Sequence, residues 1–556
     1  MSVASIAASE VASERAESVA ERWRLELSNF GVALGAFGLG AVMAVMQSLA
    51  RADLPVWFSS PRMYYISVTA HGVLMALVFT TFFIMGLGYV VARTTLGRLD
   101  SEGWGWLSFW VAAVGTVMAA LAILSGSSTV LYTFYPPLQA HPAFYIGATL
   151  LIVGSWIWCG VMLRTWILWR RAHQEPVPLP MHGMLVTVMI WILATIGLAI
   201  EVLVLLIPWS LGLVERIDPI VARTFFWWFG HPLVYFWVLP AYVLWYTVLP
   251  KIAGGKLFSD TLTRAVFVMF LLFSTPVGFH HQFADPGIPA SWKMVHTVLT
   301  YAVLFPSMIT AFTVIASLEV AGRLRGGEGL FGWLGKLPWR DPFFLAVALA
   351  MITFAFGGIG GAINAAYAMN VVVHNTAFIQ AHFHLTIGTA VALTFMGATY
   401  WLLPRLTGRE LALKRLALAQ SYLWFFGMVL FSWTTHITGL MGQPRRVFSS
   451  SFLGAQDAGA WRVLTAISAA GGVVLFASSA SFLLVVIATL GWGRRIAAPA
   501  VEYAEALDEL PVRASVWDRL GLWMAVAALL VVLAYGWPLW HLLSMERFGS
   551  PGFKPF

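Results

Sequence analysis

Residues 225–235 read F-F-W-W-F-G-H-P-L-V-Y, and they place His231 four residues before Tyr235 inside a long apolar run. Side chains four residues apart lie on one face of a helix, with about 5–6 Å between their Cβ atoms. Taken alone, such a pair is most simply a buried histidine with a hydrogen bond, because buried polar groups are usually satisfied in this way. The histidines elsewhere in the chain decide between this interpretation and a functional one.

The composition identifies a membrane protein. Of the 556 residues, 60% are hydrophobic and 10% are charged, and the mean hydropathy is +0.80. Soluble domains are about 25% charged, so the chain is predicted to be a polytopic membrane protein. Its single cysteine, Cys159, excludes a disulfide framework, a thiolate cluster and any two-cysteine copper site within this chain. The net charge of +8 is attributed to loop topology rather than to a nucleic-acid partner.

Apolar segments long enough to cross a membrane recur along the chain. They predict an all-α bundle of about 13 transmembrane helices, near residues 29–50, 63–92, 105–126, 143–169, 183–214, 221–249, 262–283, 291–321, 341–367, 371–404, 416–440, 462–493 and 517–543. Residues 1–28 have no apolar core, unlike a signal peptide, and are predicted to form an N-terminal arm. The remaining divisions are a membrane core over 29–545, a polar loop at 494–516 within it, and a tail over 546–556.

Basic residues give the expected orientation. The loops after the even-numbered spans carry most of the lysine and arginine, and the opposite loops carry little, apart from Arg445 and Arg446. Cytoplasmic loops collect basic residues, so we expect a cytoplasmic N-terminus, a cytoplasmic 494–516 loop and an outer C-terminus.

Six histidines fall at one depth in the outer half of this predicted bundle. They come from four spans and are His71, His231, His280, His281, His382 and His384. Ionisable or polar groups inside a membrane are functional by default, and imidazole binds Cu, Fe and Zn. For any one of them a satisfied core histidine is the simpler interpretation, but for all six together a set of metal sites is favoured.

The spacing sorts these histidines. His382 and His384 are two residues apart and so point about 200° apart on a helix, which lets one helix serve two metals. His280 and His281 are adjacent, and Pro276 and Gly278 before them can loosen the turn so that both face one ion. Adding His231 makes a three-histidine site.

These residues resemble subunit I of the heme-copper oxygen reductases, and most closely the B-type, or ba-type, cytochrome c oxidases. The resemblance covers nearly the whole chain. Its segments are L-Y-T-F-Y-P-P-L (131–138), V-A-R-T-F-F-W-W-F-G-H-P-L-V-Y-F-W (221–237), S-T-P-V-G-F-H-H-Q-F-A-D-P-G (274–287), V-V-H-N-T-A-F-I-Q-A-H-F-H-L (372–385) and Q-P-R-R (443–446).

The resemblance implies a role for each matching residue. His231, His280 and His281 would bind the copper CuB, His382 the iron of a high-spin heme of a or related type, and His71 and His384 the iron of a low-spin heme b. Tyr235 would be cross-linked to His231. Arg445 and Arg446 would pair with heme propionates as guanidinium–carboxylate partners, with Asp285, His374 and Asn364 also at the cofactors. The reaction implied is four-electron reduction of O2 to water, with proton pumping.

Hydroxyl groups suggest a proton path from the cytoplasm to this site. Tyr235, Tyr242 and Tyr246 share one helical stripe, and Ser307 and Thr310, three residues apart, share a face of another span. This arrangement matches the single K-type path of the B family. The simpler alternative is interfacial tyrosines and hydroxyls bonded to their own helix backbone.

Several positions depart from the family or have no role in it. Leu233 stands where the A-type pattern H-P-E-V-Y carries glutamate, so no D-type path is expected. Asn370 stands where the B-type relatives have aspartate, so a proton-loading role would move to His374, Asp285 or a propionate. Glu201, inside span five, has no assigned role, and a neutral, hydrogen-bonded carboxyl is expected. His296 and His436 are expected to be structural.

Two other functions fit part of the pattern. A nitric oxide reductase is the alternative within redox chemistry, although Tyr235 in H-x-x-x-Y argues against it. A secondary transporter is a different class, although no inverted repeat is evident. Because the chain lacks a two-cysteine copper site, the oxidase hypothesis implies a subunit II carrying CuA outside the membrane and, through it, cytochrome c or another soluble donor. A small additional membrane subunit is also expected, and no nucleic acid.

Overall fold

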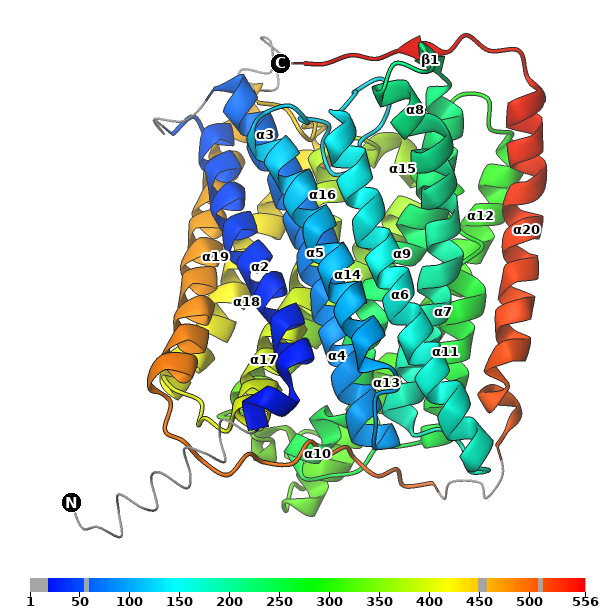
Figure 1. Cartoon of the computed structure of the whole chain (residues 1–556). Coiled ribbons are helices and arrows are strands. Elements are labelled where there is room, and N and C mark those ends of the chain that lie inside the picture. Colours follow the sequence, from blue (N-terminus) through cyan, green and yellow to red (C-terminus); the bar gives the residue numbers. More distant parts are fainter. Residues whose placement is uncertain (1–18, 55–59, 449–457, 509–513, 556) are drawn as a thin grey trace.

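The computed structural model describes residues 19–54, 60–448, 458–508 and 514–555, and it is an all-α bundle (Figure 1). Within these residues 13 helical segments are long and apolar enough to cross a membrane, which confirms the predicted number. Short strands β1 (Arg216–Ile217) and β2 (Ser550–Pro551) pair antiparallel at the upper face in Figure 1.

The helices follow the predicted order. Their bounds are α2 Arg24–Arg51, α3 Pro61–Gly72, α4 Thr80–Leu96, α5 Glu102–Leu124, α6 Pro142–Ala172, α7 Leu179–Ile200, α8 Ile207–Ser210, α9 Pro219–Thr247, α10 Leu249–Ala253, α11 Asp260–Ser274, α12 Ala290–Ala302, α13 Leu304–Leu324, α14 Pro342–Ala365, α15 Tyr367–Val373, α16 Ala377–Leu385, α17 Ala392–Thr407, α18 Lys414–Leu440, α19 Ala458–Trp492 and α20 Leu520–Ser544. Short 3₁₀ turns of three or four residues lie at Phe279–Gln282, Leu334–Lys336 and Val516–Asp518.

Three spans continue through π-helical turns. These are η1 (Val73–Phe79) between α3 and α4, η2 (Glu201–Leu206) after α7, and η5 (Thr386–Val391) between α16 and α17. Single π turns inside helices occur frequently at functional sites. Here two of them begin just after His71 and His384, and the third begins at Glu201.

The core lies around three central spans. In Pro61–Leu96, Pro219–Ala253 and Ala377–Thr407 the most apolar windows are 83%, 89% and 89% buried, whereas those of α2 and α20 are 22% and 28% buried. The pairs α5–α6, α18–α19 and α7–α9 pack against each other. A residue on a central span is therefore surrounded by protein, and the outer helices present apolar side chains to the lipid.

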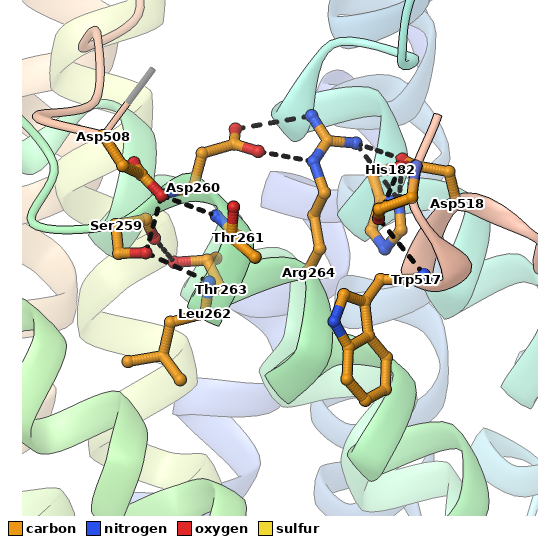
Figure 2. Close-up of polar contacts among 11 residues, drawn as sticks. His182, Ser259, Asp260, Thr261, Leu262, Thr263, Arg264, Asp508, Trp517 and Asp518 are labelled. Atoms are coloured by element: carbon orange, nitrogen blue, oxygen red, sulfur yellow. Dashed lines mark hydrogen bonds and ion pairs between the residues drawn. The ribbon is translucent and has the colours of Figure 1, made fainter. Parts of the chain in front are cut away.

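The last span is joined to the bundle by a buried ionic cluster at the lower face (Figure 2). Arg264 on α11 pairs with Asp260 through Nε and Nη2, and its Nη1 donates to Asp518 Oδ1 at 2.8 Å. The side chains of Arg264, Asp260 and Asp518 are 4%, 7% and 5% exposed. Asp518 also accepts hydrogen bonds from the Ser515 backbone and hydroxyl. The cluster thus links the segment before α20 to α11.

Replacing Arg264 with methionine should lower the free energy of unfolding by about 3–5 kcal/mol, because it leaves two buried carboxylates without their cation. Thermal denaturation of the purified protein would measure the loss. Arg494→Met is the matched control, since the Arg494–Glu410 pair is 77% and 54% exposed and an exposed pair contributes about 0–1 kcal/mol. Equal stability of the two variants would contradict the prediction.

Candidate metal and heme site

Three histidines come together in the upper half of the bundle. The possible ligand atoms of His231, His280 and His281 all lie within 4.8 Å of one another. The Nε2 atoms of His231 and His281 are buried and have no hydrogen-bond partner among the described residues. Buried polar atoms are normally satisfied, so an ion bound by these imidazoles would explain both.

A break in the helix brings the adjacent histidines to one side. The apolar segment runs from Asp260 to Gln282, close to the predicted 262–283. Within it the helix α11 ends at Ser274, and His280 and His281 lie in the 3₁₀ turn Phe279–Gln282. Their ring centroids are 4.1 Å apart. Gly278 permits the close approach of this turn to α9, because a Cβ there would lie 2.5 Å from the Trp227 carbonyl oxygen.

His231 and Tyr235 are adjacent in space as well as on the helix. His231 and Tyr235 lie on α9 with ring centroids 5.0 Å apart and planes at 57°. The His231 ring is 4.5 Å from that of His280 and nearly perpendicular to it. Tyr235 lines the same cavity as the three histidines. The phenol is therefore beside the three-histidine cluster, near the middle of α9.

Two residues that support this cluster were not found from the sequence. The Trp227 ring stacks on His281 at 3.7 Å, with the planes 6° apart. The Thr300 hydroxyl lies 3.0 Å from His280 Nδ1, which leaves Nε2 for a metal; such outer partners orient ligating histidines. Trp227 lies within residues 225–235, but only the fold reveals that its ring faces the histidine turn.

His382 and His384 point in different directions, as their spacing predicts. His382 Nδ1 lies 2.9 Å from the Gly357 carbonyl oxygen on α14. A Cβ at Gly361 would lie 3.1 Å from His382 Cε1, so glycine keeps this side of the imidazole clear. With Nδ1 donating to a carbonyl, Nε2 is the free ligand atom.

His384 faces His71 instead. Their rings are nearly parallel, at 7°, with centroids 6.2 Å apart. His71 Nδ1 lies 3.1 Å from the Gly40 carbonyl oxygen, and His384 Nδ1 lies 2.7 Å from that of Gln380. An ion held between the two rings would have metal–nitrogen bonds of about 2 Å on each side, and each nitrogen lies about 1 Å from its ring centre, so the two ring centroids would be about 6 Å apart. The pair therefore fits an iron held between two imidazoles, as in a six-coordinate heme.

All six histidines line one cavity of about 520 Å³. Its lining also includes Arg445, Arg446, Asn364 and His374. The cavity wall is mainly apolar, with a few polar groups, as is usual for a cofactor site. Asp285 is not among the lining residues. It forms an ion pair at 3.0 Å with Arg223, and Arg223 does line the cavity.

The polar groups at the upper end of the cavity are suited to anions. Arg446 Nη2 and Asn364 Oδ1 are buried without hydrogen-bond partners among the described residues. Burial, with the neighbouring charge of Arg446, lowers the pKa of Arg445 to about 10. Guanidinium groups bind carboxylates in pairs of hydrogen bonds, so this end of the cavity fits the acidic side chains of a heme.

Asn370 and His374 form a fixed pair beside these arginines. The Asn370 amide donates to the Asn364 carbonyl at 2.8 Å, and its Oδ1 lies 3.0 Å from His374 Nδ1. Burial and the nearby Arg445 lower the pKa of His374 to about 4. Burial also raises the pKa of Asp285, although Arg223 opposes the shift. His374 is thus a titratable side chain in direct contact with Asn370, whereas Asp285 pairs with Arg223.

The hydroxyl groups of the predicted proton path are placed on two neighbouring helices. Tyr246 donates to Thr310 Oγ1 at 2.7 Å. The Tyr242 and Tyr246 rings are 6.3 Å apart, and Ser307 lines the cavity with Tyr235. Ser307 and Thr310 also donate to carbonyls of their own helix, so the simpler alternative describes part of their bonding. The Tyr242 hydroxyl has no hydrogen-bond partner among the described residues.

His296 and His436 have the structural contacts expected of them, whereas Glu201 does not. His296 is fully buried between the backbone of Gly278 and Phe279 and the Ala534 carbonyl. His436 bonds to the Ser432 carbonyl and packs against Phe378. Glu201 is fully buried, but the expected hydrogen bond is missing, because neither carboxyl oxygen has a partner among the described residues.

Comparison with known proteins identifies the family of the chain. Residues 24–474 match the family described as cytochrome c and quinol oxidase polypeptide I. A cytochrome c oxidase subunit 1 of Thermus thermophilus is 48% identical over 481 residues, 85% of each chain. One from Thermostichus vulcanus is 26% identical over 431 residues, 74% of each chain. A cryo-EM structure of a heme-copper terminal oxidase dimer superposes with a TM-score of 0.92 at 37% identity, covering 96% of this chain and 94% of that one.

The fold and the histidine sites therefore define an integral membrane oxidoreductase, the core subunit of a heme-copper terminal oxidase, which reduces O2. The chain belongs to the cytochrome c and quinol oxidase polypeptide I family. Within it, the sequence pattern around Leu233 and the identity to the Thermus subunit fit the B type.

Proposed function

We propose that this chain carries out the four-electron reduction of O2 to water at a heme–CuB centre in a cell membrane, and that it pumps protons. The observation that carries the proposal is the cluster of His231, His280 and His281 beside Tyr235, in a cavity that His382 also lines. A metal held by three protein ligands keeps an open position for substrate.

Each histidine receives a metal in this proposal. His231, His280 and His281 hold CuB, His382 holds the iron of a high-spin heme of a or related type, and His71 and His384 hold the iron of a low-spin heme b. The unpartnered Nε2 atoms of His231 and His281 and the 6.2 Å spacing of His71 and His384 support these assignments. When bound, these metals would supply the redox chemistry of O2 reduction, and the residues named here would hold them in place.

The arginine pair holds the heme propionates in place. Arg445 and Arg446 bind them directly, and Asn364 and His374 complete this end of the cavity. Asp285 does not line the cavity, and it acts on this site through its ion pair with Arg223, which does. Because Asn370 cannot ionise, we assign any proton-loading role to His374, to Asp285 or to a propionate.

Protons reach the site through the hydroxyl series of Tyr246, Thr310, Ser307, Tyr242 and Tyr235. The hydrogen bond between Tyr246 and Thr310 joins α9 to α13, and Tyr235 opens on the cavity. Tyr235 then donates a proton and an electron at the centre, next to His231, to which it is covalently linked in our proposal. The path is a single one of the K type, starting at the cytoplasmic face.

Replacing Tyr242 with phenylalanine should slow proton-coupled reduction of the binuclear centre by about 10-fold or more, because it removes a hydroxyl between Tyr246 and Tyr235. A positioned proton donor contributes about 10²–10⁴-fold. Stopped-flow reduction of the high-spin heme at several pH values would measure the effect. Unchanged kinetics would mean that protons take another route.

The assembly and the orientation follow from the same proposal. The N-terminus is cytoplasmic and the C-terminus is outside. With only Cys159, electrons arrive from a partner subunit II that carries CuA outside the membrane and takes them from cytochrome c or another soluble donor. A small additional membrane subunit completes the complex.

A reduced-minus-oxidised spectrum with metal analysis of the purified complex tests the whole proposal. We expect two hemes and one copper at the three-histidine site per copy of this chain. A colourless protein would contradict any oxidase function and favour a transporter. Iron in place of copper would favour a nitric oxide reductase.

A further inference from the structure

The polar segment between the last two spans forms a belt across the lower face. We define the belt as residues 494–508, which run as an orange trace from the end of α19 beneath the bundle in Figure 1. Backbone hydrogen bonds hold its first part to the loop after α17. The Glu410 N–H donates to the Arg494 carbonyl, and the Ile496 N–H donates to the Gly408 carbonyl, each at 2.8 Å.

The second part of the belt is bonded to the end of α9. The Ala504 N–H donates to the Thr247 carbonyl oxygen at 2.6 Å. Thr247 is the last residue of α9 and directly follows Tyr246. The neighbouring Tyr503 hydroxyl lies 2.9 Å from Thr94 Oγ1 on α4. This part of the belt therefore ties the lower end of α9 to α4.

The third part of the belt reaches α13 through the loop before α11. The Leu257 N–H donates to the Glu505 carbonyl, and the Leu507 N–H donates to the Leu257 carbonyl, each at 2.8 Å. The next residue in that loop, Phe258, donates its N–H to Ser317 Oγ at 2.9 Å. Ser317 lies on α13 seven residues, about two turns, after Thr310. The belt is thus hydrogen-bonded to α9 directly and to α13 through one loop.

The C-terminal end of the belt is also held by hydrogen bonds. Asp508 accepts hydrogen bonds from the Ser259 hydroxyl and from the backbone N–H groups of Asp260 and Thr261 at the start of α11 (Figure 2). Negative charge at a helix N-terminus is favourable. The ion pairs Lys251–Glu502 and Lys256–Glu505 are largely exposed and contribute little. The belt is therefore held mainly through its backbone and Asp508.

We propose that the belt is a positioning element for the inner end of the hydroxyl series. It fixes the distance between α9 and α13, so that Tyr246 and Thr310 keep their 2.7 Å hydrogen bond. A hydrogen bond weakens steeply when its geometry is lost, and a displacement of about 1 Å can slow a reaction about 10²-fold. This inference rests on the proton path proposed above.

The test is a proline in the belt. Ala504→Pro removes the N–H that donates to Thr247, because proline has no backbone donor. The matched control is Ala497→Pro in the same belt, since Ala497 is exposed and its N–H makes no backbone hydrogen bond among the described residues. Proton uptake on reduction of the purified complex would be followed with a pH-indicator dye in H2O and in D2O.

We expect Ala504→Pro to slow proton uptake about fivefold or more and to enlarge the solvent isotope effect, with heme spectra and copper content unchanged. Ala497→Pro should match the unaltered protein. Ser317→Ala is a second variant that cuts the link to α13 without touching the belt, and we expect it to slow uptake about twofold. It serves as the test if Ala504→Pro does not assemble.

Tyr242→Phe, measured beside these variants, separates two kinds of failure. If Tyr242→Phe is slow while Ala504→Pro and Ser317→Ala match the unaltered protein, the belt has no positioning role and the proton path stands. If Tyr242→Phe also matches the unaltered protein, both the path and this inference are overturned.

Discussion

Replacing His231 with alanine is expected to remove copper and O2 reduction together, while the absorption of the low-spin heme stays unchanged. The loss of an orienting partner outside the ligand shell already costs about 10–100-fold in metal affinity or activity. Loss of a ligand should therefore reduce turnover at least about 100-fold. His231 lies with His280 and His281, whereas the parallel pair His71 and His384 lies elsewhere in the cavity, which is why that heme should survive.

Copper content by elemental analysis, turnover by O2 consumption and the reduced-minus-oxidised spectrum would be measured on the same preparation. His541→Ala on α20 is the control, because that histidine stacks on Trp537 and does not line the cavity. It should keep full copper and full turnover. A His231→Ala protein that retains copper would show that the ligand assignment is wrong.

The membrane helices, and the grouping of the six histidines around one cavity, could be predicted from the sequence. Long apolar segments indicate membrane spans by their length, because crossing the lipid core requires about 20 apolar residues in a helix whose backbone groups are all hydrogen-bonded. The opposite directions of His382 and His384 follow from helical geometry. The break before His280 was expected from Pro276 and Gly278. The predicted span 262–283 agrees with the apolar helical segment Asp260–Gln282, within which α11 ends at Ser274.

What the sequence could not give is contact between residues far apart along the chain. The belt is bonded through backbone N–H and carbonyl groups, which every residue except proline carries and which no sequence pattern marks. Arg264 and Asp518 are 254 residues apart, and Trp227 and His281 stack although one is on α9 and the other in a 3₁₀ turn. The π turns after His71 and His384 also escape a search based on a period of 3.6 residues.

Replacing Tyr235 with phenylalanine is the sharpest test of chemistry as distinct from metal binding. The change removes one oxygen atom and leaves the ring that packs against His231 and Phe270. Copper and both hemes should therefore be retained. Turnover should fall at least about 100-fold, because a positioned proton donor contributes about 10²–10⁴-fold and Tyr235 is the phenol beside the three-histidine cluster.

Tyr400→Phe on α17 is the matched control for the loss of a buried phenol. The Tyr400 hydroxyl donates to Gln420 at 2.9 Å and is not part of the cavity lining. This variant should lose about 1–3 kcal/mol of stability, because the buried Gln420 Oε1 is left without its donor, and keep its turnover. If Tyr235→Phe behaved in the same way, with full metal content and normal turnover, the phenol would be a packing residue, and the i,i+4 spacing of His231 and Tyr235 would have the simple meaning of two neighbours on one helical face.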